Sequence, residues 1–426
     1  MKLNNQRSIQ NTIIFYNGFL SLPDIIHKFK KSGIIDLIHW PYNYISLLKC
    51  SSDINFKEIL TQLKCNYSDF RMFHETEHFR RVDQSKLNDA LTYIKSSVNY
   101  VEIDKSPKFL REKLNSGVCL NDHINIFYDF YKLSEHEIDL RNCYESFVNS
   151  SVRKLLPHSN VRIFGSTLSR LGKFDSDLDM KIILNERNYQ PCQSIQILKS
   201  IESKLQTDNP YMVKSFVIPC RFPILHYFDG VLSLNVDISI KPDKSLEVCS
   251  LLKLISTKYE FFSYLCVIIK QIYLYEGVLF DRPNIYFTGF KIVALVLHFL
   301  QYKKLIPSLE NIVNSNQEDQ ITRPDLGDLL IEFFQYMIKF NPNFAIDLSR
   351  GCLVAKSQDV FLQCNFHFDP SLNITSNIGK DQWIKFTESN KNILKTLKVD
   401  NHAKIWGLAS FIDSNETLWK TSSFNN

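Results

Sequence analysis

Two aspartates, Asp177 and Asp179, stand at the start of an apolar run that ends at Leu184. Alternate side chains of a strand share a face, so this spacing puts both carboxylates on one side and turns Leu178 toward a core. Carboxylate oxygens of this kind suit Mg²⁺, which proteins usually bind through one or two carboxylates together with substrate phosphates. The pair therefore predicts a site for metal-assisted phosphoryl transfer.

A Gly-Ser turn precedes the aspartate pair. Gly165 and Ser166 follow the strand-like segment "VRIF", which ends at Phe164, and they precede "TLSRLG", which can open a helix. Backbone N–H groups at such a turn, with the Ser166 hydroxyl, can hold a phosphate. We therefore expect the turn to contact the phosphates of a nucleotide.

A third carboxylate is expected from the segment "VLSLNVDISI", residues 231–240. Apolar residues alternate there with polar ones, which predicts a strand whose polar face carries Asp237. Two-metal phosphoryl transfer commonly needs such a further carboxylate beside the attacking hydroxyl. A lone D-x-D pair is most often a solvated strand end, but the turn, the pair and Asp237 in this order favour an active site.

The chain divides by pattern into three segments. Residues 1–105 read as a small α/β module, with strand-like segments at 11–19 and 42–50 and helical ones at 22–33 and 55–63. Residues 106–242 hold the site, preceded by helical spacing over 122–156. Long apolar stretches at helical period fill residues 243–426, which predicts a helical domain.

Composition excludes several other classes of protein. The net charge of the 426 residues is only +5, so RNA binding would need a local basic surface. Ten scattered cysteines without a C-x-x-C pair indicate reduced thiols inside a cell. No run approaches the roughly 18 apolar residues of a membrane span. Met1–Pro23 carries only Lys2 and Arg7 as charges and reads equally as a weak organelle-import leader or as the start of a domain.

The segment "FGSTLSRLGKFDSDLDM" resembles the nucleotidyltransferase signature of the template-independent poly(A) and uridylyl polymerases, in the polymerase-β superfamily. "CRFPIL" (220–225) is similar to that family's strand before the third aspartate, and residues 329–351 to its poly(A)-polymerase-associated helical segment. "FDPSLNITSNI" (368–378) and "KIWGLASFI" (404–412) are similar to the tail of the mitochondrial poly(A) polymerase branch. The resemblance covers about residues 140–412.

The resemblance implies an α+β fold: a nucleotidyltransferase palm of mixed sheet and helices, a helical poly(A)-polymerase-associated domain, and a small RNA-binding-like (RRM-like) module before them. It implies that Asp177, Asp179 and Asp237 bind Mg²⁺ or Mn²⁺ and act beside the RNA 3′ hydroxyl. It also implies that Phe164, Gly165 and Ser166 bind the nucleotide.

Two contacts in the helical domain are likewise implied by the resemblance. Lys270 stands where the family has a lysine on the triphosphate, and Phe290 where it has an aromatic ring stacked on the incoming base. Stacking suits any base, so Phe290 does not select ATP over UTP. Around these residues the chain departs from the family at Glu260, Tyr273, Gly289 and Lys291.

We therefore expect an enzyme that adds AMP from ATP to RNA 3′ ends, in mitochondria or alternatively in the cytoplasm. The alternatives are a terminal uridylyltransferase that uses UTP, and a non-catalytic RNA-binding scaffold. The family branch forms dimers, which implies a homodimer. The motif "HETEH" (74–78) matches a zinc pattern but has no third ligand nearby, so we interpret it as a solvated charged segment.

Overall fold

The structure is a computed structural model that describes part of the chain in full. The described residues are 104–184, 190–209, 212–220, 222–230, 232, 234–240, 244–279, 287–314, 324–366, 373–398 and 406–413, and elsewhere only the backbone of several strands. Contacts divide the chain into two compact units. The first comprises Met1–Ser106, Leu133–Leu168 and Phe174–Leu246, and the second Pro107–Lys132, Ser169–Lys173 and Glu247–Asn426.

The N-terminal part of the first unit contains a five-stranded sheet of order β5-β1-β3-β2-β7. Strands β2 and β7 run parallel and the other pairs are antiparallel. The strands predicted within 11–19 and 42–50 are confirmed by β1 and β3, whereas the helical predictions at 22–33 and 55–63 and "HETEH" lie outside the described residues. The bounds are β1 Thr12–Tyr16, β2 Ile34–Trp40, β3 Ile45–Cys50, β5 Phe70–Met72 and β7 Asn99–Glu102, with a short pair β4 Asn66–Tyr67 and β6 Arg80–Arg81.

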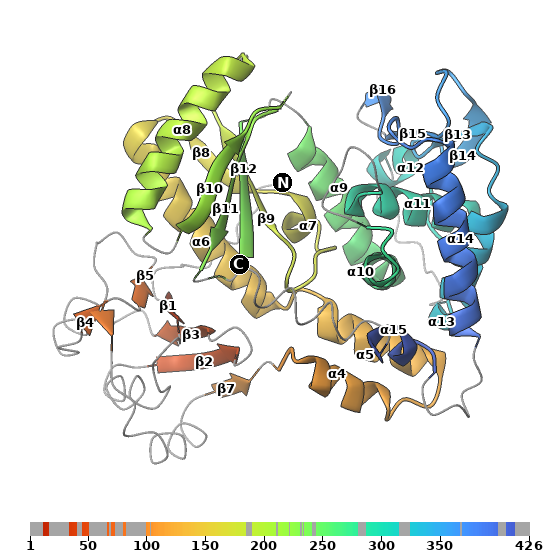
Figure 1. The fold of residues 1–426 in the computed structure, drawn as a ribbon, viewed down its shortest axis with the longest axis horizontal. Coiled ribbons are helices and arrows are strands. Elements are labelled where there is room, and N and C mark those ends of the chain that lie inside the picture. The colour runs from red at the N-terminus through yellow and green to blue at the C-terminus, as the bar shows by residue number, and fades with distance from the viewer. Residues whose placement is uncertain are drawn as a thin grey trace. The chain divides into compact units, whose positions relative to one another are not determined.

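A second sheet in this unit, of order β10-β11-β12-β9-β8, positions the candidate site. Its bounds are β8 Asn160–Ile163, β9 Leu178–Ile183, β10 Met212–Ile218, β11 Ile224–Asp229 and β12 Leu234–Ser239. Strands β9 and β12 are parallel, and the other neighbours are antiparallel. The helices of this part are α6 Glu135–Leu155, α7 Gly165–Leu168 and α8 Pro191–Asp208 (Figure 1).

Period-two alternation decides which face of this sheet is buried. One set of strand residues forms a core with the apolar faces of α6 and α8. The intervening residues, which include Asp179 and Asp237, lie on the opposite face. The shared core contains Leu178, Met180 and Ile182 of β9, Leu225 and Tyr227 of β11, and Val236 and Ile238 of β12.

Side chains of helix α6 also accept hydrogen bonds from the backbone of the edge strand β8. The helix begins at a capping box, in which Ser134 and Glu137 satisfy each other's backbone N–H groups. Farther along, Glu145 accepts a hydrogen bond of 2.6 Å from the backbone of Ile163, and Asn149 accepts one of 2.9 Å from Val161. These side chains thereby pair N–H groups that an edge strand would otherwise leave without a hydrogen bond.

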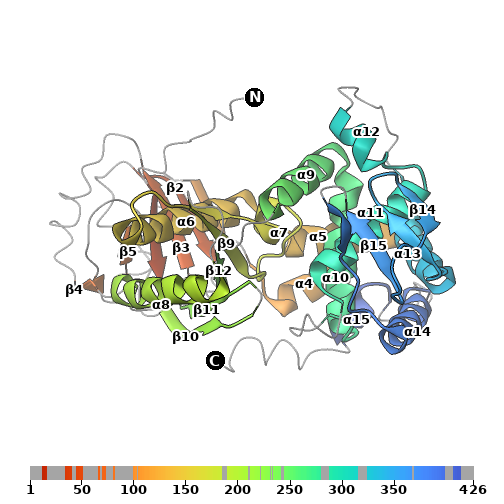
Figure 2. The same ribbon diagram turned by 90° about the horizontal axis from the view of Figure 1, so that it is seen from above.

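The second unit combines helices with a four-stranded sheet of order β14-β13-β15-β16 (Figure 2). Periodicity predicts its helices, but the sheet is a finding that the predicted helical domain did not include. The helices are α4 Pro107–Leu114, α5 Leu120–Tyr131, α9 Ser245–Lys258, α10 Glu260–Tyr275, α11 Gly289–Tyr302, α12 Leu309–Asn314, α13 Leu326–Lys339, α14 Lys380–Leu397 and α15 Ala409–Asp413. The strands are β13 Phe344–Asp347, β14 Cys352–Ala355, β15 Gln363–Phe366 and β16 Asp369–Asn373.

Helix α10 is the centre of the second unit, because nearly all of its side chains are buried. An apolar helix of this length needs cover on every side. Among the described residues, no helix is both long enough and apolar enough to span a membrane.

Candidate active site

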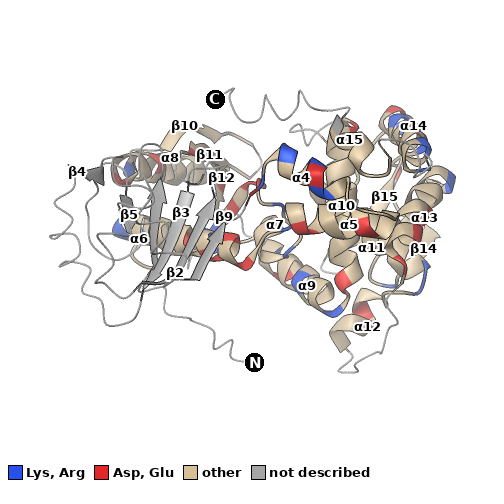
Figure 3. Cartoon of the chain, turned by 90° about the horizontal axis from the view of Figure 1, so that it is seen from below, with Lys and Arg blue, Asp and Glu red and all other residues tan. Residues whose placement is uncertain are grey.

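The register of two parallel strands brings two of the predicted aspartates together. Asp237 of β12 is the direct partner of Asp179 of β9. Neighbouring strands lie about 4.8 Å apart, so the two carboxylates share one face of the sheet at close range. Figure 3 shows acidic residues on both strands.

Asp177 lies just before β9, in the loop that leads into the strand. Its Oδ1 accepts a hydrogen bond of 3.2 Å from the side-chain amide of Asn235, which is on β12 two residues before Asp237. All three predicted aspartates therefore belong to one neighbourhood of the sheet.

Burial and repulsion from neighbouring carboxylates both act on Asp179. Burial, together with the nearby Asp237 and Asp177 carboxylates, raises the pKa of Asp179 to about 7. A divalent cation would relieve that repulsion, so the donor set fits Mg²⁺ or Mn²⁺. In the part of the chain that the structure describes, no three acidic, His or Cys side chains form a ready-made metal cage. Substrate oxygens and water would therefore have to complete the coordination.

The Gly-Ser turn packs directly against Asp179. The backbone N–H of Phe164 donates to the Asp179 carbonyl at 3.0 Å, and the Ser166 N–H donates to the Asp179 carboxylate. Gly165 has φ of +64°, and a Cβ placed there would lie 2.0 Å from Asp179 Oδ2. Only glycine allows both this backbone conformation and this approach. Because the turn and the carboxylate are in contact, a phosphate on the turn would lie beside a metal bound at the carboxylate.

We expect Gly165→Ala to reduce nucleotide transfer at least a hundredfold and to destabilise the protein by about 1–3 kcal/mol. The methyl group must displace either the turn or the Asp179 carboxylate. Primer extension and thermal unfolding would measure the two effects. Gly379→Ala, at a helix N-terminus in the second unit, is the control. Wild-type activity in Gly165→Ala would show that the close approach is unnecessary.

Arg141 of α6 is a site residue that the sequence reasoning missed. Its guanidinium is fully buried and donates to the carbonyls of Phe174, Ser176 and Asp177 and to Thr167 Oγ1, at 2.7–3.3 Å. Burial lowers the pKa of Arg141 to about 10, although nearby acidic groups oppose that shift. The side chain therefore ties the loop that presents Asp177 to α7 and α6.

His226 of β11 is the second missed residue. It is the strand partner of Asp237, and its Nδ1 lies 2.7 Å from Asp237 Oδ1. Alternation in "ILHYFD" was a usable signal, because Leu225 and Tyr227 point into the core and so turn His226 to the aspartate face.

In the second unit, Lys270 of α10 is buried and donates its ammonium to the carbonyl of Leu171. Ser256 Oγ donates to the Ser169 carbonyl at 3.2 Å, and Lys173 Nζ donates to Gln271 Oε1 at 2.7 Å. Residues 169–173, in the middle of the segment that resembles a nucleotidyltransferase signature, are thus hydrogen-bonded to α9 and α10. The predicted contact between Lys270 and a triphosphate stays a prediction.

Phe290 is at the start of α11, with 38% of its surface exposed and its ring 5.8 Å from that of Phe366. The preceding residue, Gly289, lies against the Lys270 side chain, because a Cβ placed at Gly289 would be 3.5 Å from Lys270 Cδ. Burial lowers the pKa of the adjacent Lys291 to about 8. A half-exposed ring suits base stacking, which stays a prediction.

Residues 120–257 match the family described as "Poly(A) RNA polymerase, mitochondrial-like, central palm domain". The mitochondrial poly(A) RNA polymerase of Mus musculus is 22% identical over 361 residues, covering 72% of this chain and 62% of that protein. The Poly(A) RNA polymerase protein 2 of Saccharomyces cerevisiae is 26% identical, covering 54% of this chain and 36% of that protein. This chain thus aligns with less than two thirds of either relative.

A crystal structure of mtPAP in complex with GTP superposes with a TM-score of 0.75 at 20% identity, covering 95% of this chain and 96% of that one. Other mtPAP crystals contain UTP, CTP or ATPγS. This likeness confirms the predicted fold class, a nucleotidyltransferase palm with a helical domain.

Proposed function

We propose that this chain is an RNA nucleotidyltransferase that extends 3′ ends with AMP from ATP. The match of residues 120–257 to the mitochondrial-like poly(A) RNA polymerase central palm domain supports the proposal. The observation that carries the proposal is the in-register pair Asp179 and Asp237, with Gly165 packed against it. Carboxylates in that arrangement suit in-line transfer of a nucleotidyl group.

Each residue of the site has a role in this proposal. Asp177 and Asp179 would hold both divalent cations, and Asp237 would complete the metal site beside the RNA 3′ hydroxyl. Gly165 and Ser166 orient the terminal phosphates. A bound divalent ion would neutralise charge on the attacking and leaving oxygens. The 3′ hydroxyl gives its proton to the Asp237 carboxylate, and its oxygen attacks the α-phosphorus. The bond from the α-phosphorus to the bridging oxygen breaks, and pyrophosphate leaves.

The choice of nucleotide and the setting also belong to the proposal. ATP is supported by the names of the relatives, while mtPAP has been crystallised with several different nucleotides. UTP is the alternative substrate. The mouse relative supports action on mitochondrial RNA. We further propose the domain boundaries 1–105, 106–242 and 243–426, a homodimer, and nucleotide contacts by Phe164, Lys270 and Phe290.

The test is extension of a labelled RNA primer with Mg²⁺ and each nucleotide singly, with wild type, Asp237→Asn and the exposed control Asp381→Asn. We expect a ladder with ATP that Asp237→Asn reduces at least a thousandfold and Asp381→Asn leaves intact. A ladder with UTP alone would identify the uridylyl alternative. If folded protein binds RNA but gives no ladder with any nucleotide, the enzyme proposal is wrong and the non-catalytic RNA-binding scaffold is the better interpretation.

A further inference from the structure

An exposed aromatic residue continues the catalytic row of the sheet. Strand register aligns Phe216 of β10 with His226 of β11, His226 with Asp237 of β12, and Asp237 with Asp179 of β9. All four side chains therefore stand on the same face, opposite the core that α6 and α8 cover.

A β-bulge produces this alignment. Between the pairs Val213–Phe228 and Phe216–His226, β10 advances three residues while β11 advances two. Lys214 takes up the extra residue with φ of +51°, a conformation that non-glycine residues rarely adopt. Without the bulge, Ser215 would face His226. The strand thus adopts a strained conformation at a point that puts an aromatic ring on the sheet face of Asp179 and Asp237.

The ring is accessible. Phe216 is 51% exposed although it is one of the largest apolar side chains, and its centroid lies 5.2 Å from the His226 ring at an interplanar angle of 49°. His226 in turn is hydrogen-bonded to Asp237 at 2.7 Å. The rings of Phe216 and His226 therefore form a continuous row from the edge strand β10 to Asp237. The proposed function puts the RNA 3′ hydroxyl beside Asp237.

We propose that Phe216 and His226 form a stacking shelf for the base of the 3′-terminal RNA nucleotide. The inference rests on the proposed function. Phe216 lies two strands from Asp237, about 10 Å between backbones, a span that the ribose and base of a single nucleotide bridge. With the 3′ hydroxyl at Asp237, the base is directed along the row toward β10.

Stacking also suits the chemistry of repeated addition. Every base has a π-face, so a shelf holds the end of any RNA without reading its sequence. After each transfer the new terminal nucleotide can occupy the same shelf.

The test compares wild type with Phe216→Ala on two RNAs, one with a normal 3′-terminal adenosine and one ending in an abasic ribose. Affinity is measured by fluorescence anisotropy without nucleotide, and extension is measured with ATP. Phe216→Ala should weaken binding of normal RNA roughly 5- to 100-fold. Wild type should bind the abasic RNA more weakly than normal RNA by the same factor. Phe216→Ala should bind the two RNAs with nearly equal affinity. Phe216→Tyr should restore binding, and the KM for ATP should change less than about twofold.

Phe344→Ala removes a similarly exposed ring from the second unit and is the matched control. Equal penalties for the abasic end in wild type and Phe216→Ala would overturn the shelf, even where normal RNA is extended. Absence of extension by wild type would instead refute the proposed function. The anisotropy measurements with normal and abasic RNA would still test the stacking shelf. A changed oligomeric state of Phe216→Ala with unchanged RNA binding would identify a protein interface and also overturn it.

Discussion

Replacing Asp179 with asparagine should reduce nucleotide transfer at least a thousandfold and, at the same time, stabilise the metal-free protein above neutral pH. The loss of activity follows from removal of the charged oxygen that the proposed function uses as a metal ligand beside Asp237. The gain in stability follows from the cost of holding that charge in a buried site among other carboxylates. Active sites commonly contain charged groups that destabilise the folded protein in this way.

The pH dependence has a defined direction. In the unfolded chain Asp179 ionises near its ordinary pKa of 3.8, whereas in the folded protein its pKa is about 7. Below pH 3.8 both states hold the proton, so this group has no effect on stability. Between pH 3.8 and 7 only the unfolded state loses it, and the folded state becomes progressively less stable, by up to about 2–4 kcal/mol. Asparagine mimics the protonated acid and removes this loss.

Thermal unfolding of both proteins in EDTA from pH 4 to 9 measures the difference. The midpoint of Asp179→Asn should exceed that of wild type increasingly as the pH rises to 7, and Mg²⁺ should raise the midpoint of wild type more than that of the variant. Equal midpoints at pH 8 would contradict the expected cost of a buried Asp179 charge among other carboxylates.

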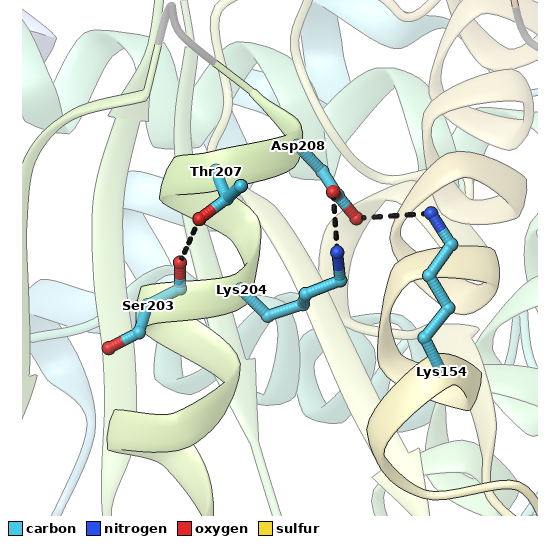
Figure 4. Close-up of polar contacts among 5 residues, drawn as sticks. All are labelled: Lys154, Ser203, Lys204, Thr207 and Asp208. Atoms are coloured by element: carbon cyan, nitrogen blue, oxygen red, sulfur yellow. Dashed lines mark hydrogen bonds and ion pairs between the residues drawn. The ribbon is translucent and has the colours of Figure 1, made fainter. Parts of the chain in front are cut away.

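Asp208 of α8 is a matched contrast in the same unit. Burial alone would raise the pKa of Asp208, but hydrogen bonds from Lys204 and Ser151 and the charge of Lys154 outweigh it and lower the pKa. Figure 4 shows the carboxylate between the two lysines, at 2.7 Å from Lys204 and 3.5 Å from Lys154. Asp208→Asn should therefore destabilise the protein slightly above pH 4 rather than stabilise it.

The shared sheet face of the carboxylates can be predicted from the sequence because its signal is local. Spacing alone gives the shared face of Asp177 and Asp179, and alternation gives the polar face of the strand with Asp237. Register between strands distant in sequence is not local, so the pairing of Asp237 with Asp179 required the structure. The same holds for the bulge at Lys214, which no residue type announces.

The sheet of the second unit escaped prediction for a different reason. Strands β13, β14 and β15 have four residues each, too few for alternation to stand out beside long apolar helices. Arg141 was missed although its position is informative, since it lies on the apolar face of α6 with Ile138 and Tyr144. A lone arginine among core residues indicates buried acceptors, but the sequence does not say which.

Replacing Arg141 with methionine should therefore have a large effect without touching substrate. Methionine fills the volume but leaves four oxygen acceptors without their donor, three of them carbonyls of the loop before β9. Loss of a buried charged donor typically costs about 3–5 kcal/mol. The loop that presents Asp177 should lose its fixed position, and the Asp179 carboxylate should lose a nearby positive charge.

The role of Arg141 is positioning, so its kinetic effect should be selective. We expect kcat to fall about a hundredfold and the Mg²⁺ concentration for half-maximal rate to rise, with a smaller change in the KM for ATP. Arg141→Lys keeps the charge but not the fork of donors, and should recover stability more than kcat. Arg153→Met removes an exposed arginine of the same helix, with one bond of 3.1 Å to the Ser159 carbonyl, and should cost less than about 1 kcal/mol. If Arg141→Met has the same free energy of unfolding and the same kcat as Arg153→Met, the position of the loop before β9 does not depend on the buried guanidinium.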